Sequence, residues 1–252
     1  MLAIISDLHS NMEALHAVME DIGSQGVREI LCLGDVVGYG PNPEECIDLV
    51  EERCRFCLSG NHDYAVLTRP ERFNPLAVEA IEYTKKVLKP GAFSVGRKRA
   101  RWNFLQAMPT RITEDSTLYV HGSPRDDRNE YILESDIVFG NAEKIKQIFD
   151  LTPRVLFVGH THVPGVITTE MEFWHPEDNN ASYQFQPDRK YLVNVGSVGQ
   201  PRDGDNRSCY AIVEPDRVTW RRVPYDFRKT MEQMARVGPI SKEAADRLEY
   251  GR

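Results

Sequence analysis

The 252-residue chain has few cysteines and no long apolar segment, and both absences exclude classes of protein. Five cysteines, an odd number without regular spacing, argue against a disulfide framework and favour a reducing, cytoplasmic location. No apolar run approaches the ~20 residues that span a bilayer, so we expect no transmembrane helix. The start of the chain, Met1 to Asp7, lacks a basic segment and predicts a β-strand rather than a signal peptide.

Positive charge is also scarce. The chain has 31 Lys and Arg against 38 Asp and Glu, which gives a net charge of -7. This balance makes nucleic acid an unexpected partner and gives no indication of a membrane partner, although a cationic pocket remains compatible with it. Hydrophobic residues make up 41% and charged residues 27%, values typical of a folded protein. The length suits a single domain over residues 1–252.

Short apolar runs alternate with helical patterns in the first 60 residues. Asn11 and Asn42 stand where they could cap the two expected helices. The β-α-β-α-β order implies a largely parallel sheet. The expected strands cover 2–6, 28–33 and 55–59, and the expected helices cover 11–24 and 43–53.

The rest of the chain is richer in strand patterns, so we expect an α/β first half and a β-rich second half. Residues 122–139 are polar and rich in turn formers, and residues 174–189 predict a surface loop or a loop that covers the substrate. Helices are expected over 74–107 (two, broken at Pro90-Gly91), 141–149 and 226–251. Strands are expected over 110–113, 118–121, 155–158, 165–169, 183–185, 191–195, 209–214 and 218–223.

Five of the expected strands run into residue types that bind metals, three of them across a glycine. In open α/β sheets, sites form beyond the carboxyl ends of the strands. A single histidine is usually structural, but five of the seven histidines share this position, which indicates one common site. The residues at these strand ends are Asp7, His9, Asp35, Asn61, His62, His121, His160 and His162.

The spacing and the chemistry of these residues favour a metal centre. Asp7 and His9 are two residues apart, as are His160 and His162, so each pair points to one side of an extended chain. Nitrogen and oxygen ligands without thiolate suit Mn, Fe, Co, Ni or Zn. The Cys54–Cys57 CxxC motif has no second pair, and we expect it to lead into a buried strand.

Five motifs in order resemble the signature of the calcineurin-like metallophosphoesterase superfamily: Asp7-Leu8-His9, Gly34-Asp35, Gly60-Asn61-His62-Asp63, His121 and Gly159-His160-Thr161-His162. The stretch from Asn194 to Asp205, which contains Gly-Gln-Pro-Arg, extends the likeness to the bacterial and archaeal small-phosphodiesterase branch. The resemblance implies a four-layer α/β/β/α sandwich of two mixed β-sheets flanked by helices.

The resemblance also implies roles for the residues at the strand ends. One divalent ion would be held by Asp7, His9, Asp35 and His162, and the other by Asp35, Asn61, His121 and His160. Manganese is the first expectation, with Fe, Ni, Co or Zn as alternatives. A hydroxide bridging the ions would attack phosphorus in line, with Asp35 and His62 as the catalytic residues.

The expected substrate is a small phosphoester or a nucleotide-like diester, contacted by Asn61, His62 and Arg202, although Arg202 could equally form a structural ion pair. Asp63 either orients His62 or caps the following helix. No prediction is made for the oligomeric state.

Three other functions remain in view. Ser/Thr protein phosphatases carry Gly-Asp-x-x-Asp-Arg-Gly, where this chain has Gly34 to Gly40 without the second Asp and the Arg. A non-catalytic scaffold, as in the retromer subunit with this fold, is disfavoured because all the ligand positions hold suitable residues. A nuclease is disfavoured by the net charge of -7.

Overall fold

The computed structural model describes residues 1–71, 73–238 and 240–252. Residues 2–57 alternate strands and helices in the predicted order, with α2 beginning at Pro43, where proline suits the first turn. The elements of the first half are β1 (Leu2–Ile5), α1 (Met12–Ser24), β2 (Ile30–Cys32), α2 (Pro43–Arg53), β3 (Phe56–Cys57), α3 (Asn61–Leu67), α4 (Pro75–Leu88), α5 (Arg97–Ala107), β4 (Arg111–Glu114) and β5 (Thr117–Val120). The helix α3 that follows β3 has no counterpart among the expected helix ranges.

The second half is richer in strands, as expected, and ends in two helices around Gly238, which adopts a left-handed φ of 77°. Its elements are α6 (Glu134–Val138), α7 (Ala142–Leu151), β6 (Val155–Val158), β7 (Gly165–Thr168), β8 (Phe173–Trp174), η1 (Pro176–Asn179), β9 (Ser182–Gln184), β10 (Tyr191–Asn194), β11 (Ser208–Glu214), β12 (Arg217–Val223), α8 (Phe227–Val237) and α9 (Lys242–Tyr250).

The strands form two mixed sheets of six. The first has the order β3-β2-β1-β11-β12-β9, and the second has the order β4-β5-β6-β10-β7-β8. Within the first sheet β1, β2 and β3 are parallel, and within the second β5, β6 and β10 are parallel. The carboxyl ends of each parallel group therefore lie along one edge of its sheet.

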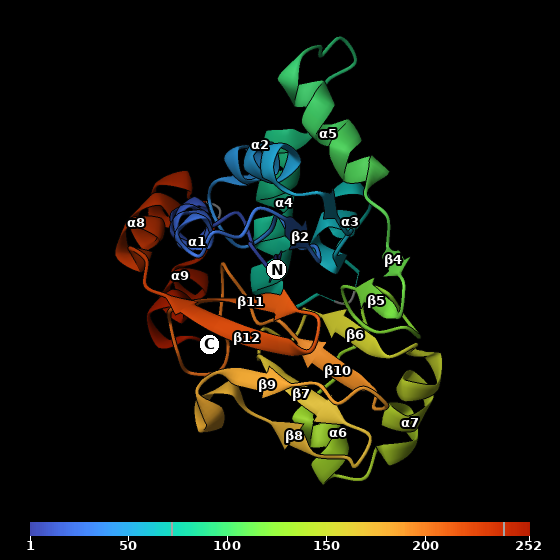
Figure 1. The fold of residues 1–252 in the computed structure, drawn as a ribbon. Helices are drawn as coiled ribbons and strands as arrows, with labels where there is room; N and C mark the ends of the chain where they lie inside the picture. The colour runs from blue at the N-terminus through green and yellow to red at the C-terminus, as the bar shows by residue number, and fades with distance from the viewer. Residues whose placement is uncertain (72, 239) are drawn as a thin grey trace.

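The two sheets pack face to face, and helices cover their outer faces (Figure 1). Strand β1 shows how the sequence produces these layers: Ile4 lies in the core between the sheets, whereas Ala3 and Ile5 lie in the core under the helices. Such two-sided burial explains the unbroken apolar runs of the central strands. The four-layer α/β/β/α sandwich that the resemblance implies is confirmed.

Two local predictions need correction. Asn42 precedes α2, but its side chain makes no capping hydrogen bond, whereas Asn11 accepts one from the Ala14 backbone N–H as predicted. Of the two alternatives for residues 174–189, the loop that covers the substrate is not found, because none of these residues, among those that the structure describes, lines the cleft described below. The strand expected over 183–185 is present as β9, which pairs with β12 at the edge of the first sheet.

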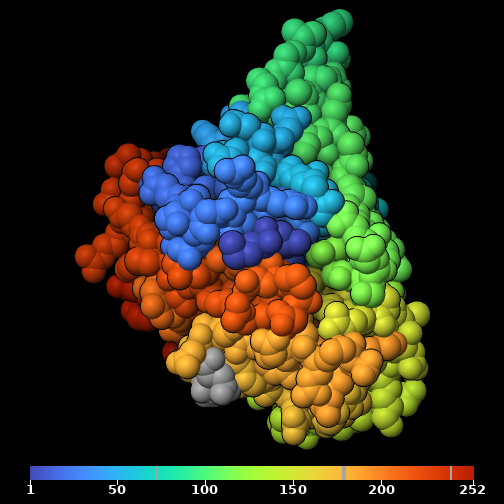
Figure 2. Space-filling view, viewed as in Figure 1, coloured from blue at the N-terminus to red at the C-terminus, as the bar shows by residue number. Residues whose placement is uncertain are grey.

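The helices α4 and α5 form a hairpin whose tip projects away from both sheets (Figures 1 and 2). None of the helices in the described ranges has an apolar stretch long enough to cross a membrane. Helix α8 lies beside α1 (Figure 1). The Thr230 hydroxyl of α8 donates a hydrogen bond of 2.9 Å to the side-chain oxygen of Asn11, the residue before α1.

Candidate metal centre

The loops that follow β1, β2, β3, β5 and β6 meet where the carboxyl ends of the two sheets come together. The eight residues predicted from the strand ends lie in these loops and at the start of α3. Except for Asn61, each of them is at most 4% exposed. We call this group the central cluster: Asp7, His9, Asp35, Asn61, His62, His121, His160 and His162.

The backbone of the central cluster is strained. Asp7, His9, Asp35, His160 and His162 all have positive φ, between 49° and 65°, a region that residues other than glycine rarely adopt. Such conformations cost about 1–3 kcal/mol each and persist where the surrounding structure imposes them. Backbone hydrogen bonds between the loops impose them here, including one of 2.9 Å from the His9 N–H to the Asp35 carbonyl oxygen.

Two glycines allow the carboxylates to reach the centre. A Cβ atom on Gly60 would overlap the Asp35 side-chain oxygen Oδ1, and one on Gly159 would overlap the Asp7 oxygen Oδ2. The same carboxylates accept backbone hydrogen bonds, from His62 N–H to Asp35 (2.8 Å) and from His160 N–H to Asp7 (3.0 Å). These contacts fix the direction of both side chains.

Backbone carbonyl groups orient three of the imidazole rings. His9, His121 and His162 direct Nδ1 toward the carbonyl oxygens of Val37 (3.4 Å), Leu33 (3.0 Å) and Gln200 (2.5 Å). A carbonyl oxygen only accepts hydrogen bonds, so Nδ1 carries the proton and Nε2 faces the centre.

His160 is turned the other way. Its Nε2 lies 3.1 Å from the Asn129 carbonyl oxygen, so its Nδ1 is the nitrogen left to face the centre.

Two unsatisfied contacts show that the central cluster fits a cation. Burial lowers the pKa of His9 and of His162, so both rings are neutral near pH 7, yet their Nε2 atoms face each other at 3.1 Å. With Nδ1 protonated in both rings, two lone pairs point at one another. Beside them, the buried Oδ1 of Asp7 has no hydrogen-bond partner. A divalent ion would satisfy all three atoms.

The ligand atoms form two main groups, Asp7, His9 and His162 in one and Asp35, His121 and His160 in the other. A third group, His9, Asp35 and His62, overlaps both. The Asp35 oxygen Oδ2 lies 3.9 Å from His9 Nε2 and 3.3 Å from His121 Nε2, so it faces both groups.

Asn61 adds its Oδ1 at 3.1 Å from His121 Nε2. The arrangement matches the two ligand sets that the resemblance implies, and roles in metal binding remain predictions.

The electrostatics of the second group differ from those of the first. Burial alone would lower the pKa of His121, but the charge and hydrogen bond of Asp35, together with the charges of Asp7 and Asp63, outweigh burial and raise it to about 9. Burial lowers the pKa of His160 to about 3. Burial would likewise raise the pKa of Asp35, but the charge and hydrogen bond of His121, with contributions from His62 and His9, together lower it well below its usual value. Asp35 therefore remains a carboxylate.

His62 belongs to the central cluster but stands apart from the two main groups. Its ring packs against His9, Tyr39 and Phe73, with ring centroids 4.7–4.9 Å away. Burial lowers the pKa of His62 to about 4, and its Nδ1 has no hydrogen-bond partner among the described residues.

Asp63 does not orient His62. Its two carboxylate oxygens accept hydrogen bonds from the Gly60 N–H (3.0 Å) and the Val37 N–H (3.2 Å). The carboxylate caps α3 and ties it to the loop after β2, so the capping alternative holds.

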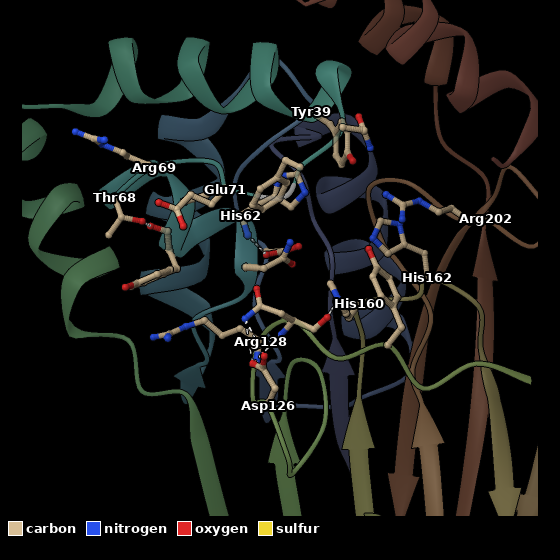
Figure 3. Close-up of a pocket in the computed structure, with 18 of the residues that line it drawn as sticks. Tyr39, His62, Thr68, Arg69, Glu71, Asp126, Arg128, His160, His162 and Arg202 are labelled. Carbon is tan, nitrogen blue, oxygen red and sulfur yellow. Dashed lines mark hydrogen bonds between the residues drawn. The ribbon is translucent and has the colours of Figure 1, made fainter. Parts of the chain in front are cut away.

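A cleft of about 840 Å³ opens over the central cluster (Figure 3). Arg202 lines it, as the substrate-binding prediction requires, and its guanidinium hydrogen-bonds the Gln200 side chain at 2.8 Å. The cleft also holds aromatic residues that sequence reasoning missed, because they come from segments without a motif. Tyr131 is one of them, and its ring stacks on His160 with centroids 3.9 Å apart.

Residues 1–217 match the family model described as the calcineurin-like phosphoesterase superfamily domain. The chain belongs to this family. It is 36% identical over 260 residues to an uncharacterised protein of Methanocaldococcus jannaschii, covering 100% of this chain and 98% of that protein. The family explains why the chain combines two mixed sheets with metal-ligand residues at their strand ends.

Two solved structures resemble the whole chain. A metallophosphoesterase from Sphaerobacter thermophilus is 36% identical with a TM-score of 0.81, over 100% of this chain and 98% of that one. A hypothetical protein of Pyrococcus horikoshii shares the fold at 17% identity, with a TM-score of 0.73 over 100% of this chain and 99% of that one. As a metallophosphoesterase, the chain belongs with hydrolases that act on phosphoesters and use divalent metal ions.

Proposed function

We propose that this metallophosphoesterase is a phosphodiesterase that uses two divalent ions. The observation that carries the proposal is the position of Asp35, whose Oδ2 faces both His9 and His121 and so could bind two ions at once. One ion would take Asp7, His9 and His162 besides Asp35, and the other would take Asn61, His121 and His160. Manganese is the metal we expect first.

Two divalent ions supply charge neutralisation at the phosphate and a water activated for attack in line with the leaving oxygen. The chain's own residues provide the rest. Asp7 and Asp35 contribute two negative charges, while the histidines, including His121 once an ion displaced its proton, and Asn61 would be neutral ligands, so the loaded centre would keep a positive charge that attracts phosphate. The cleft over the centre gives such a substrate an approach.

His62 is proposed to contact the phosphate and to protonate the leaving oxygen. It follows Asn61 directly at the start of α3 and lines the cleft, while its ring is held by aromatic neighbours rather than by a carboxylate. A buried neutral imidazole carries an N–H that can donate a hydrogen bond to a phosphate oxygen, and to protonate the leaving oxygen the ring would first have to take up a second proton, which the negative charge of a bound phosphate would favour. The role proposed for His62 therefore does not require Asp63 to leave its hydrogen bonds to the Gly60 and Val37 N–H groups.

The protein-phosphatase alternative loses support from the loop after β2. Gly38 stands where that motif has its second aspartate, and a Cβ atom there would overlap Nδ1 of His62. Tyr39 stands where the motif has its arginine, and its ring packs on His62 with centroids 4.7 Å apart. The chain thus has neither the carboxylate that would orient His62 nor the guanidinium that would hold a phosphate at that position.

The dimensions and the charge of the cleft support a diester. At about 840 Å³ it exceeds the space needed for a phosphate group alone. Arg202 lies on one side of the centre, and Arg69 and Arg128 lie on the other (Figure 3). Groups on both sides of a phosphate could therefore be contacted, which suits a small nucleotide-like diester.

The test compares the hydrolysis of bis-p-nitrophenyl phosphate and p-nitrophenyl phosphate by the purified protein, with added Mn²⁺ or Ni²⁺ and after chelation. We expect metal-dependent cleavage that favours the diester. His16→Ala is the matched control, because His16 is exposed on α1 away from the cleft, and it should retain full activity.

Failure to cleave either ester with any metal would overturn the proposal and favour the scaffold alternative. Faster cleavage of the monoester would overturn the preference for diesters.

A further inference from the structure

One wall of the cleft is formed by α3 and the residues just after it. Asn61 and Tyr64 are three residues apart and share a helix face, and Thr68 follows at the C-terminal end of the helix. All three line the cleft. At about 1.5 Å per residue, this wall extends about 10 Å from the central cluster. It is much longer than a phosphate group, so it could contact what is attached to the phosphate.

Tyr64 and Arg128 form a stacked pair on this wall. The central guanidinium carbon of Arg128 lies 4.4 Å from the centroid of the Tyr64 ring, and Tyr64 remains 47% exposed. Among the residues that the structure describes, the Arg128 guanidinium hydrogen-bonds through its Nε alone, at 3.3 Å to the Ser59 hydroxyl. The stacking holds the guanidinium over the ring and leaves its terminal nitrogens available.

No described carboxylate pairs with the Arg128 guanidinium. Asp126 lies in the same loop, but its oxygens accept hydrogen bonds from the backbone N–H groups of Arg128 (3.2 Å) and Asn129 (3.1 Å). The neighbouring Arg125 differs, because its guanidinium lies 3.2 Å from the Glu130 carboxylate. Arg128 is thus a cation in the cleft whose charge is not neutralised by the protein.

We propose that Tyr64 and Arg128 bind the leaving group of the substrate, and that this group carries a planar ring and a second anionic group. The proposal rests on the proposed function, because it takes the phosphate under attack to lie at the central cluster. His62, the proposed acid for the leaving oxygen, is on the same helix, so the leaving group would extend along this wall. The ring would lie against Tyr64, and the terminal nitrogens of Arg128 would bind the anion.

Two other charged residues lie on this side of the cleft. Figure 3 shows Arg69 and Glu71 beyond His62, on the side opposite Arg202. Arg69 adds a second positive charge for an anion, whereas Glu71 would repel it. Replacing Glu71 with glutamine should therefore strengthen the binding of a ligand with two anionic groups, the reverse of the effect of removing Arg128.

The test measures binding by isothermal titration calorimetry with the Mn²⁺-loaded protein and four probes. Inorganic phosphate occupies the centre alone, ribose 5-phosphate lacks a planar ring, AMP adds the ring, and adenosine 3′,5′-bisphosphate adds a second phosphate. We expect the bisphosphate to bind about tenfold more tightly than AMP, and AMP about fivefold more tightly than ribose 5-phosphate.

Arg128→Gln should abolish the preference for the bisphosphate over AMP while changing the affinity for inorganic phosphate less than about twofold. Tyr64→Leu should abolish the preference for AMP over ribose 5-phosphate. Arg125→Gln removes the same charge from the same loop outside the cleft, so it should preserve both preferences.

The proposal is overturned if the wild-type protein does not prefer the bisphosphate, or if Arg128→Gln keeps that preference. Either result, together with metal-dependent cleavage of bis-p-nitrophenyl phosphate, leaves the proposed function intact. Failure to cleave either p-nitrophenyl ester with any metal would instead refute the proposed function.

Discussion

The central cluster and the outer part of the cleft differ in how firmly their residues are held. In the central cluster, backbone carbonyls fix the rings of His9, His121 and His162, and the surrounding loops impose left-handed backbone conformations. In the outer part, Tyr64 and Tyr131 are 47% and 43% exposed. We infer that the cluster performs the chemistry, while the outer residues decide which substrate is accepted.

Asp35→Asn should have the largest effect, because Asp35 Oδ2 faces His9 in one ligand group and lies 3.3 Å from His121 in the other, closer than the 3.9 Å between Asp7 Oδ1 and His121. Without its charge the second ion would be lost, and kcat on bis-p-nitrophenyl phosphate should fall at least about 10⁴-fold. Metal content and turnover are measured together. A variant that keeps two ions per chain and normal turnover would show that Asp35 does not bridge.

His62→Ala should lower kcat by about 10²–10⁴-fold while the protein keeps both metal ions. The reason is that His62 stands outside the two main ligand groups, although it lies near His9 and Asp35. Elemental analysis of the variant separates the two roles. Unchanged kcat in the fully loaded variant would refute the role in catalysis, and loss of one ion would make His62 a ligand.

Gly60→Ala tests whether the geometry of the cluster is as tight as its contacts suggest. The added Cβ atom would overlap Asp35 Oδ1 and displace the carboxylate. Because a displacement of about 1 Å can cost about 10²-fold in rate, we expect a loss of that order in kcat. Activity within twofold of wild type would mean that the central cluster tolerates movement. The cluster would then not be held more firmly than the outer part of the cleft.

Arg202→Gln should affect binding more than chemistry, raising KM about tenfold with a smaller change in kcat. Arg202 lines the cleft, and its buried Nε has no hydrogen-bond partner among the described residues. Arg207→Gln is the control, since Arg207 pairs with Asp205 at 2.6 Å outside the cleft lining. If both substitutions raise KM equally, Arg202 acts through its positive charge alone and does not contact the substrate.

Gly23→Ala gives the smallest expected effect and supplies the contrast to Gly60→Ala. Gly23 lies in α1, and a Cβ atom there meets nothing within 4 Å. Alanine should raise the free energy of unfolding by about 0.5–1 kcal/mol and leave turnover unchanged. Thermal or urea unfolding measures the change, and a clear loss of stability would contradict it.

The difference between the central cluster and the outer part of the cleft also explains which features the sequence could predict. The strand β6, Val155–Val158, is apolar on both faces and runs directly into Gly159 and His160, so the element and its site residues are readable from one short segment. The pair of Tyr64 and Arg128 joins segments 64 residues apart in sequence, and no local pattern predicts that contact. Only the folded chain brings them together.

Short elements were missed for a different reason. The strand β8 has two residues and α6 has five, too few for a period of two or of 3.6 to be recognised. In β8 the pairing with β7 determines the conformation, so tertiary contacts outweigh the local sequence. The reversed ring of His160 likewise depends on Asn129, which lies in a distant loop.

Anomalous X-ray scattering from crystals grown with Mn²⁺ tests directly whether the central cluster binds two ions. We predict two peaks, one against Asp7, His9 and His162 and the other against Asn61, His121 and His160, with Asp35 between them. His160 should bind through Nδ1 and the other histidines through Nε2. A single peak, or peaks away from Asp35, would contradict the account.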